Sequence, residues 1–162
     1  MRQPQNLNHT LLKQRLLTKN LLKDIHTVKE DFPSLEYITT SDSLVGEIDV
    51  FNDLSEYVET FTVSIKIPSD YPCGVPVAHE LSKIIMPRGD KRHISVKGEL
   101  CLDIPHKLEL LALTGLTLQK FTKEILYPYL VNQCYFNLEK CYAGEEYDHG
   151  LKGIVQLSLI HI

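Results

Sequence analysis

The sequence predicts an α+β domain with an N-terminal helix, a four-stranded antiparallel meander, an irregular segment and C-terminal helices. Three observations predict it. A helical pattern of apolar residues comes first, strict apolar/polar alternation follows, and helical periodicity returns only after residue 117. No βαβ alternation occurs, and neither GxGxxG nor GxxxxGK[ST] is present, so phosphate-cradling folds are not expected.

Length and composition bound the class of protein. The 162 residues are 43% hydrophobic and 23% charged, which is typical of one globular domain. We expect that domain to span residues 10–156 after a frayed segment of residues 1–9. A formal net charge of -4 argues against a general nucleic-acid binder.

Neither a membrane nor a secreted location is expected. There is no apolar run of about 18 residues, the length that a transmembrane helix needs. The N-terminus MRQPQNLNHT has no apolar signal-peptide core. The four cysteines are therefore expected to be free thiols in the cytoplasm.

The first predicted element is a helix over Thr10 to Glu30. Its apolar stripe consists of Leu11, Leu17, Leu21, Leu22, Ile25 and Val28. Pro33 cannot continue the helix and ends it. Four basic residues lie off the stripe: Lys13, Arg15, Lys19 and Lys23. A solvated face is the ordinary interpretation of such residues, and a basic docking face for a partner protein is the functional one.

Four strand signals follow the helix. They cover Leu35–Thr39, Gly46–Val50, Tyr57–Ile67 and Val77–Leu81, and the third alternates most clearly. Prolines at positions 68, 72 and 76 make the connection before the fourth strand an extended or turning loop.

The rest of the chain contains a long irregular segment and a helix. Residues 86–106 show no clear periodicity, and long structured loops in compact domains tend to be functional. A helix is predicted from Thr117 to about Glu139, and Pro128 must kink or split it.

The candidate reactive residue is Cys101, in the irregular segment. An isolated cysteine on an apolar strand is most often a small buried hydrophobe. Here Gly98 permits a turn, His93 precedes and Pro105 follows, which favours a functional site. His106 is a second acid–base candidate, although a loop histidine is usually bland. No CxxC or HxxxH pair exists, so neither a metal site nor a cofactor is expected.

Two sequence stretches make the chain resemble the ubiquitin-conjugating enzymes. They are IPSDYPCGVP, which follows the third predicted strand, and HISVKGELCLDI, which contains Cys101. The resemblance covers about residues 10–140. It implies the ubiquitin-conjugating-enzyme fold and a cysteine-dependent transferase that carries an acyl group as a thioester on Cys101, then passes it to an amine or a thiol.

Departures from the family pattern alter what the resemblance implies. Ser95 stands where the family has an Asn that supports the oxyanion, so Ser95 or nearby backbone N–H groups would supply that donor. His93 is expected to pin the loop through a backbone hydrogen bond rather than to react. The apolar stretch Leu108–Leu113 replaces the family's Trp, as in the bacterial branch.

The bacterial branch implies partners as well. It is associated with anti-phage operons that encode a cyclic-oligonucleotide synthase (CBASS), where the carrier is the C-terminus of that nucleotidyltransferase. A ubiquitin-like protein is the other expected carrier. An activating-enzyme-like protein would dock on the basic residues of the first helix, Lys13, Arg15, Lys19 and Lys23.

Two alternatives stay open. One is a non-catalytic binding module on the same fold, against which the retained Cys101 weighs. The other is the N-terminal conjugating domain of a fusion with an activating-enzyme domain. Residues 157–162, LSLIHI, match a translated frame of a transposase sequencing adapter. We therefore expect them to be non-native and the natural chain to depart after about Gln156.

Overall fold

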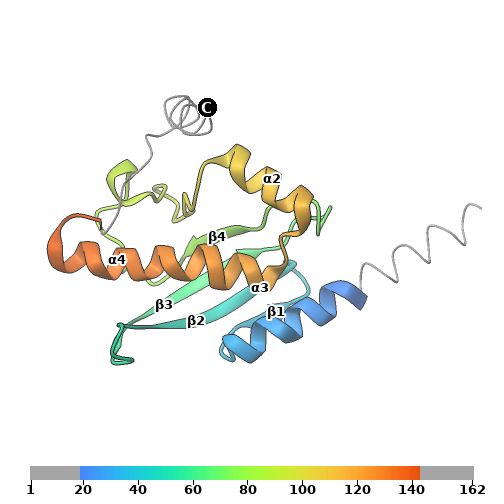
Figure 1. Cartoon of the computed structure of the whole chain (residues 1–162), viewed down its shortest axis with the longest axis horizontal. Coiled ribbons are helices and arrows are strands. Elements are labelled where there is room, and N and C mark those ends of the chain that lie inside the picture. Colours follow the sequence, from blue (N-terminus) through green and yellow to red (C-terminus); the bar gives the residue numbers. More distant parts are fainter. Residues whose placement is uncertain (1–18, 143–162) are drawn as a thin grey trace, which may run out of the picture.

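A computed structural model describes residues 19–142 of the chain. They form a four-stranded antiparallel sheet in the order β1-β2-β3-β4, with an N-terminal helix before it and helices after it (Figure 1). The predicted α+β class, the meander and the C-terminal helices are thereby confirmed. The segment expected to be frayed, residues 1–9, and the suspected adapter tail, residues 157–162, lie outside the described residues.

The described part of the N-terminal helix covers residues 19–31. Ile25 and Val28 are buried and Leu21 packs against the core, as the apolar stripe predicts. Leu22 is 54% exposed, so placing it on the stripe was wrong. Each residue advances about 100° around the helix, which turns Leu22 away from the face that Leu21 and Ile25 share.

The sheet consists of β1 (Glu36–Ile38), β2 (Ser43–Phe51), β3 (Tyr57–Lys66) and β4 (Val77–Glu80). Its buried face is built by alternate residues of β2 and β3: Leu44, Ile48, Val50, Phe61, Val63 and Ile65. Ile48 pairs with Phe61 across the two strands. This period-2 burial is what the alternating sequence predicts.

A short helix that the sequence pattern does not reveal follows the irregular segment. It is α2 (Pro105–Gly115), and Ala112 is the one residue that it buries. Without an apolar stripe that faces the core, periodicity could not distinguish this helix from a loop.

The long C-terminal helix is continuous past Pro128. It consists of α3 (Leu118–Lys120), a π-helical stretch η2 (Phe121–Leu126) and α4 (Tyr127–Glu139). The Tyr127 N–H donates to the Thr122 carbonyl, five residues back. This wider turn lies directly before Pro128, which has no N–H to give, so the chain widens where a kink was expected.

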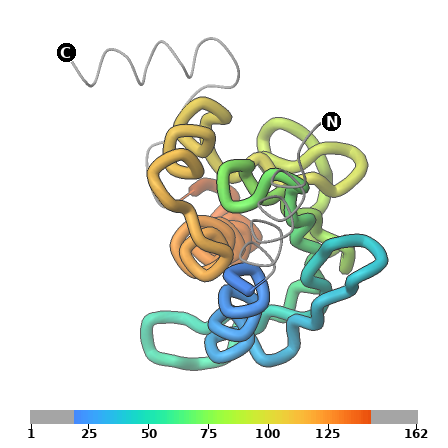
Figure 2. The backbone as a smooth tube through the Cα atoms, turned by 90° about the vertical axis from the view of Figure 1, so that its right-hand side faces the viewer, coloured from blue at the N-terminus to red at the C-terminus, as the bar shows by residue number. Residues whose placement is uncertain are grey.

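The helices pack on the sheet, and Tyr71 links the N-terminal helix to the start of α3. α4 runs across the sheet (Figure 1). Figure 2 shows α2 on one side of α4 and the N-terminal helix on the other side of α4. Tyr71, in the proline-rich loop, connects these parts. Its hydroxyl donates to Asp24 of the N-terminal helix and accepts the Leu118 N–H at 3.1 Å.

Within residues 19–142, no helix combines the length and the apolar character that crossing a membrane requires.

Candidate active site

The segment that carries Cys101 is hydrogen-bonded along both of its edges. On one edge, the Leu100 N–H donates to the Ala78 carbonyl of β4 at 2.9 Å. On the other, the Cys101 N–H donates to the His93 carbonyl at 2.8 Å. The segment therefore extends the sheet locally beyond β4 and places Cys101 shortly before α2.

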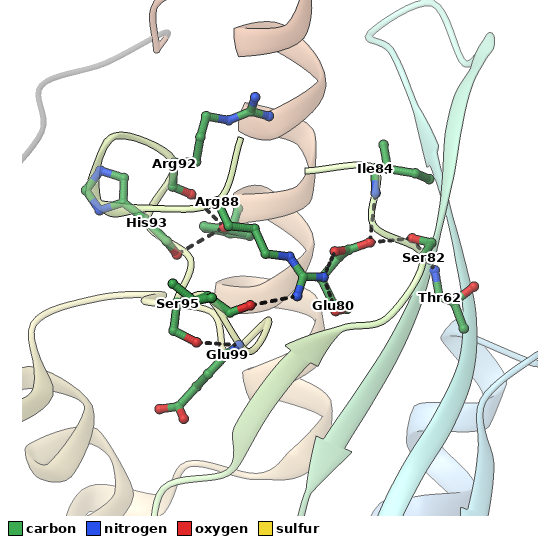
Figure 3. Close-up of polar contacts among 11 residues, drawn as sticks. Thr62, Glu80, Ser82, Ile84, Arg88, Arg92, His93, Ser95 and Glu99 are labelled. Atoms are coloured by element: carbon green, nitrogen blue, oxygen red, sulfur yellow. Dashed lines mark hydrogen bonds and ion pairs between the residues drawn. The ribbon is translucent and has the colours of Figure 1, made fainter. Parts of the chain in front are cut away.

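A tight turn closes residues 95–99 just before Cys101. The Ser95 N–H donates to the Glu99 carbonyl at 2.8 Å, and the Glu99 N–H returns to Ser95 Oγ at 3.0 Å (Figure 3). Gly98 lies in this turn with φ of 94°, a conformation that side-chain-bearing residues rarely adopt. The turn thus explains why a glycine stands three residues before Cys101.

The Cys101 thiol is exposed, in contrast to the buried Cys134. Partial burial by the surrounding protein raises its pKa, and the negative charges of Glu99 and Asp90 raise it further. The residue is therefore mainly a neutral thiol near pH 7. Such a thiol suits an acyl transfer in which the incoming group is already activated.

His93 contacts Cys101 through its main chain. Its carbonyl accepts the Cys101 N–H, and its backbone is left-handed, with φ of 49°. The imidazole lies edge-on to the Tyr142 ring, with the ring centroids 5.5 Å apart. The His93 carbonyl thus joins its own loop to the Cys101 backbone through a hydrogen bond.

Ser95, predicted from the sequence as an oxyanion donor, lies in the turn that precedes Cys101. Its Oγ accepts the Glu99 N–H, which leaves its own proton to donate. The N–H groups of Glu99, Leu100 and Cys101 all have acceptors within the fold. These three backbone donors are therefore engaged, whereas the Ser95 hydroxyl keeps donor capacity.

A buried ion pair between Glu80 and Arg88 contacts the turn of residues 95–99. Glu80, at the end of β4, is 1% exposed and pairs with Arg88 at 2.9 Å (Figure 3). Glu80 also accepts from Ser82 Oγ and from the Ile84 N–H, while Arg88 reaches the Val96 carbonyl at 3.2 Å. Sequence analysis missed this pair, because nothing in the local pattern shows that residues 80 and 88 meet.

A second support comes from α4. Arg92 is buried, and its guanidinium donates to Gln133 Oε1 and to Asn137 Oδ1, both at 2.8 Å. It also lies 4.5 Å from the centroid of the Phe136 ring, within cation–π range. Tyr129, Gln133 and Asn137 recur every four residues on one helix face. That spacing was the signal in the sequence that could have revealed this polar column.

Of the predicted docking residues, the two that the structure describes lie apart from this site. Lys19 and Lys23 are exposed on the N-terminal helix. Lys13 and Arg15 lie outside the described residues. Figure 1 shows the N-terminal helix well separated from the segment that precedes α2. Lys19 and Lys23 therefore lie on a different part of the surface from the Cys101 segment.

Two histidines lie near the Cys101 segment in the chain or across the sheet. His79 faces Glu99 across the local pairing, with His79 Nε2 3.9 Å from Glu99 Oε2. His106 is exposed in the first turn of α2. Among the residues described, no three His, Cys, Asp or Glu side chains are grouped so that they could hold a metal ion.

No protein-family model and no curated protein matches the chain.

Proposed function

We propose that this chain is a ubiquitin-conjugating-like transferase that carries an acyl group as a thioester on Cys101. The observation that carries the proposal is the exposed Cys101 thiol, on a segment hydrogen-bonded along both edges beside the Ser95–Glu99 turn. The element order and the two family-like stretches around residues 67–76 and 93–104 add to it.

The reaction consists of two exchanges at one acyl carbon. In the first, Cys101 Sγ attacks the thioester on an activating enzyme. A new S–C bond forms, the enzyme's sulfur leaves, and the Cys101 proton passes to that leaving thiolate. In the second, an amine or a thiol attacks, Cys101 leaves as a thiolate, and the proton of the attacking group restores the thiol.

The surroundings of Cys101 fit this chemistry. The incoming acyl group is already activated, so a strongly acidic thiol is not required. Each attack creates an oxyanion, and a positioned hydroxyl donor stabilises such a charge. The Ser95 hydroxyl is the proposed donor, in place of the family's Asn.

The proposed setting is bacterial anti-phage (CBASS) signalling. The carrier is then the C-terminus of a cyclic-oligonucleotide synthase. An activating-enzyme-like protein transfers this carrier to Cys101. The exposed Lys19 and Lys23 support docking of that partner on the N-terminal helix.

The test is to co-express the full chain with the activating-enzyme-like protein and the synthase, then to separate products without and with thiol reductant. Wild type should form an adduct with the synthase that reductant removes. Cys73→Ser, which changes another exposed thiol, should behave as wild type. Cys101→Ser should give no adduct or a reductant-resistant one.

Identical adducts from Cys101→Ser and wild type would show the proposal to be wrong. If no adduct forms, and iodoacetamide fails to label Cys101 under native conditions, a binding module on the same fold is favoured instead.

A further inference from the structure

Tyr129 is buried on α4 and contacts the main chain of residues 92 and 93, which precede Cys101. The single hydroxyl proton of Tyr129 is shared between two consecutive carbonyls, that of Arg92 at 2.9 Å and that of His93 at 3.1 Å. The His93 carbonyl also accepts the main-chain N–H of Cys101 at 2.8 Å. One carbonyl oxygen thus joins the hydroxyl on α4 to the backbone of the candidate nucleophile.

We propose that Tyr129 is a positioning residue for Cys101, because its hydroxyl holds the His93 carbonyl where the Cys101 N–H reaches it. The importance of this role for acyl transfer rests on the proposed function. The placement of the Cys101 backbone can be measured without any carrier or activating enzyme.

The other contacts of α4 leave this task to Tyr129. Gln133 Nε2 donates to the Arg92 carbonyl at 3.0 Å, and Gln133 and Asn137 bind the Arg92 side chain. These bonds fix Arg92. The His93 carbonyl, in contrast, accepts from the Tyr129 hydroxyl of α4.

The position of the backbone matters because the sulfur of a cysteine is only two bonds from Cα. A shift of the Cys101 main chain therefore moves Sγ by a similar amount. Misplacing a reacting group by about 1 Å can slow a reaction by about 100-fold. A buried hydroxyl on a rigid helix suits the task of preventing that shift.

Two neighbouring amides report the two edges of the segment separately. The Cys101 N–H points to His93 and hence to α4, whereas the Leu100 N–H points to Ala78 on β4. A change confined to the α4 edge alters hydrogen exchange at Cys101 alone. A general loss of stability accelerates exchange at both amides.

The experiment compares amide hydrogen exchange at Cys101 and Leu100 by NMR in the full chain. Tyr129→Phe keeps the buried ring and removes only the hydroxyl. We expect the ratio of the Cys101 to the Leu100 exchange rate to rise about fivefold to tenfold, the equivalent of one net hydrogen bond. Tyr127→Phe removes a hydroxyl from the same helix that contacts Phe51 instead, and should leave the ratio unchanged.

An unchanged ratio in Tyr129→Phe overturns the inference, and so does an equal acceleration at both amides. The result stays separate from that of the proposed function. A raised ratio supports the positioning role even if wild type forms no thioester. A thioester on wild type with an unchanged ratio supports the transferase and rejects Tyr129 as a positioning residue.

Discussion

Gly98 shows how a single residue shapes the turn before Cys101. A Cβ at this position would lie 2.6 Å from the Glu80 carbonyl oxygen, closer than real Cβ contacts allow. The positive φ adds a conformational penalty for any other residue. The close approach of β4 and the backbone conformation therefore both require glycine here.

Replacing Gly98 should separate these two effects when it is compared with Gly115. Gly115 also has positive φ, of 109°, but a Cβ there would meet nothing within 4 Å. We expect Gly98→Ala to lower the free energy of unfolding by about 2–4 kcal/mol and Gly115→Ala by about 1–2 kcal/mol. Urea unfolding measures the free energy of unfolding of both variants, and the comparison holds when their m-values equal that of wild type. Equal losses would mean that the contact with Glu80 relaxes freely.

The charge of Glu99 acts on Cys101 at the same scale. Burial raises the pKa of the Cys101 thiol, and Glu99 is the next cause. Since a negative neighbour disfavours the thiolate, Glu99→Gln should lower this pKa. The thiolate then forms at lower pH, so the iodoacetamide alkylation curve of Cys101 should move toward lower pH.

Peptide mass spectrometry measures this alkylation at Cys101 separately from the other exposed thiols. Glu109→Gln, an exposed change on α2, is the matched control and should leave the curve in place. The shift should shrink as salt is added, because Glu99 is itself exposed. A Glu99→Gln curve that overlays that of wild type would refute the electrostatic explanation.

At the scale of elements, α4 holds the irregular segment through buried polar contacts. Gln133 is fully buried, accepts from Arg92 Nε and donates to the Arg92 carbonyl. Such a residue is costly to remove, because a buried guanidinium would lose a partner that water cannot replace.

Gln133→Leu should therefore lower the free energy of unfolding by about 2–3 kcal/mol. Gln119→Leu is the matched control on the same long helix. Its side chain bonds Asp31 at the surface, and its loss should cost less than about 1 kcal/mol. Chemical denaturation of both variants tests the contrast. If both variants lose the same free energy of unfolding, the contacts of Gln133 with Arg92 contribute no more than a surface hydrogen bond.

At the scale of the whole molecule, Tyr71 joins parts that are far apart in the sequence. Its hydroxyl binds Asp24 of the N-terminal helix and accepts the buried Leu118 N–H at the start of α3. Burial and the bond to Asp24 raise the pKa of this phenol, so it remains a neutral donor at ordinary pH.

Tyr71→Phe should lower the free energy of unfolding by about 1–2 kcal/mol, because the Leu118 N–H is left without its acceptor. Tyr127→Phe removes a hydroxyl that meets the Phe51 N–H at the exposed end of β2, and should cost less than about 0.5 kcal/mol. Thermal unfolding followed by circular dichroism compares the two. A melting temperature of Tyr71→Phe no lower than that of Tyr127→Phe would contradict this role.

The sequence by itself determined the elements whose residues bury one regular face. The alternation over Tyr57–Ile67 predicted β3 to within a residue, and the apolar spacing placed the N-terminal helix and the helix that begins after Thr117. It also singled out Cys101, through the composition of its neighbourhood. Local periodicity is visible in a sequence because each residue's face depends only on its neighbours.

Only the tertiary structure decided what holds the Cys101 segment. The pairing of Glu80 with Arg88, and the grip of Tyr129 and Gln133 on residues 92–93, join positions up to 41 apart. α2 stayed invisible to the pattern because it buries little. Contacts between distant residues depend on how whole elements pack, and no local pattern specifies that packing.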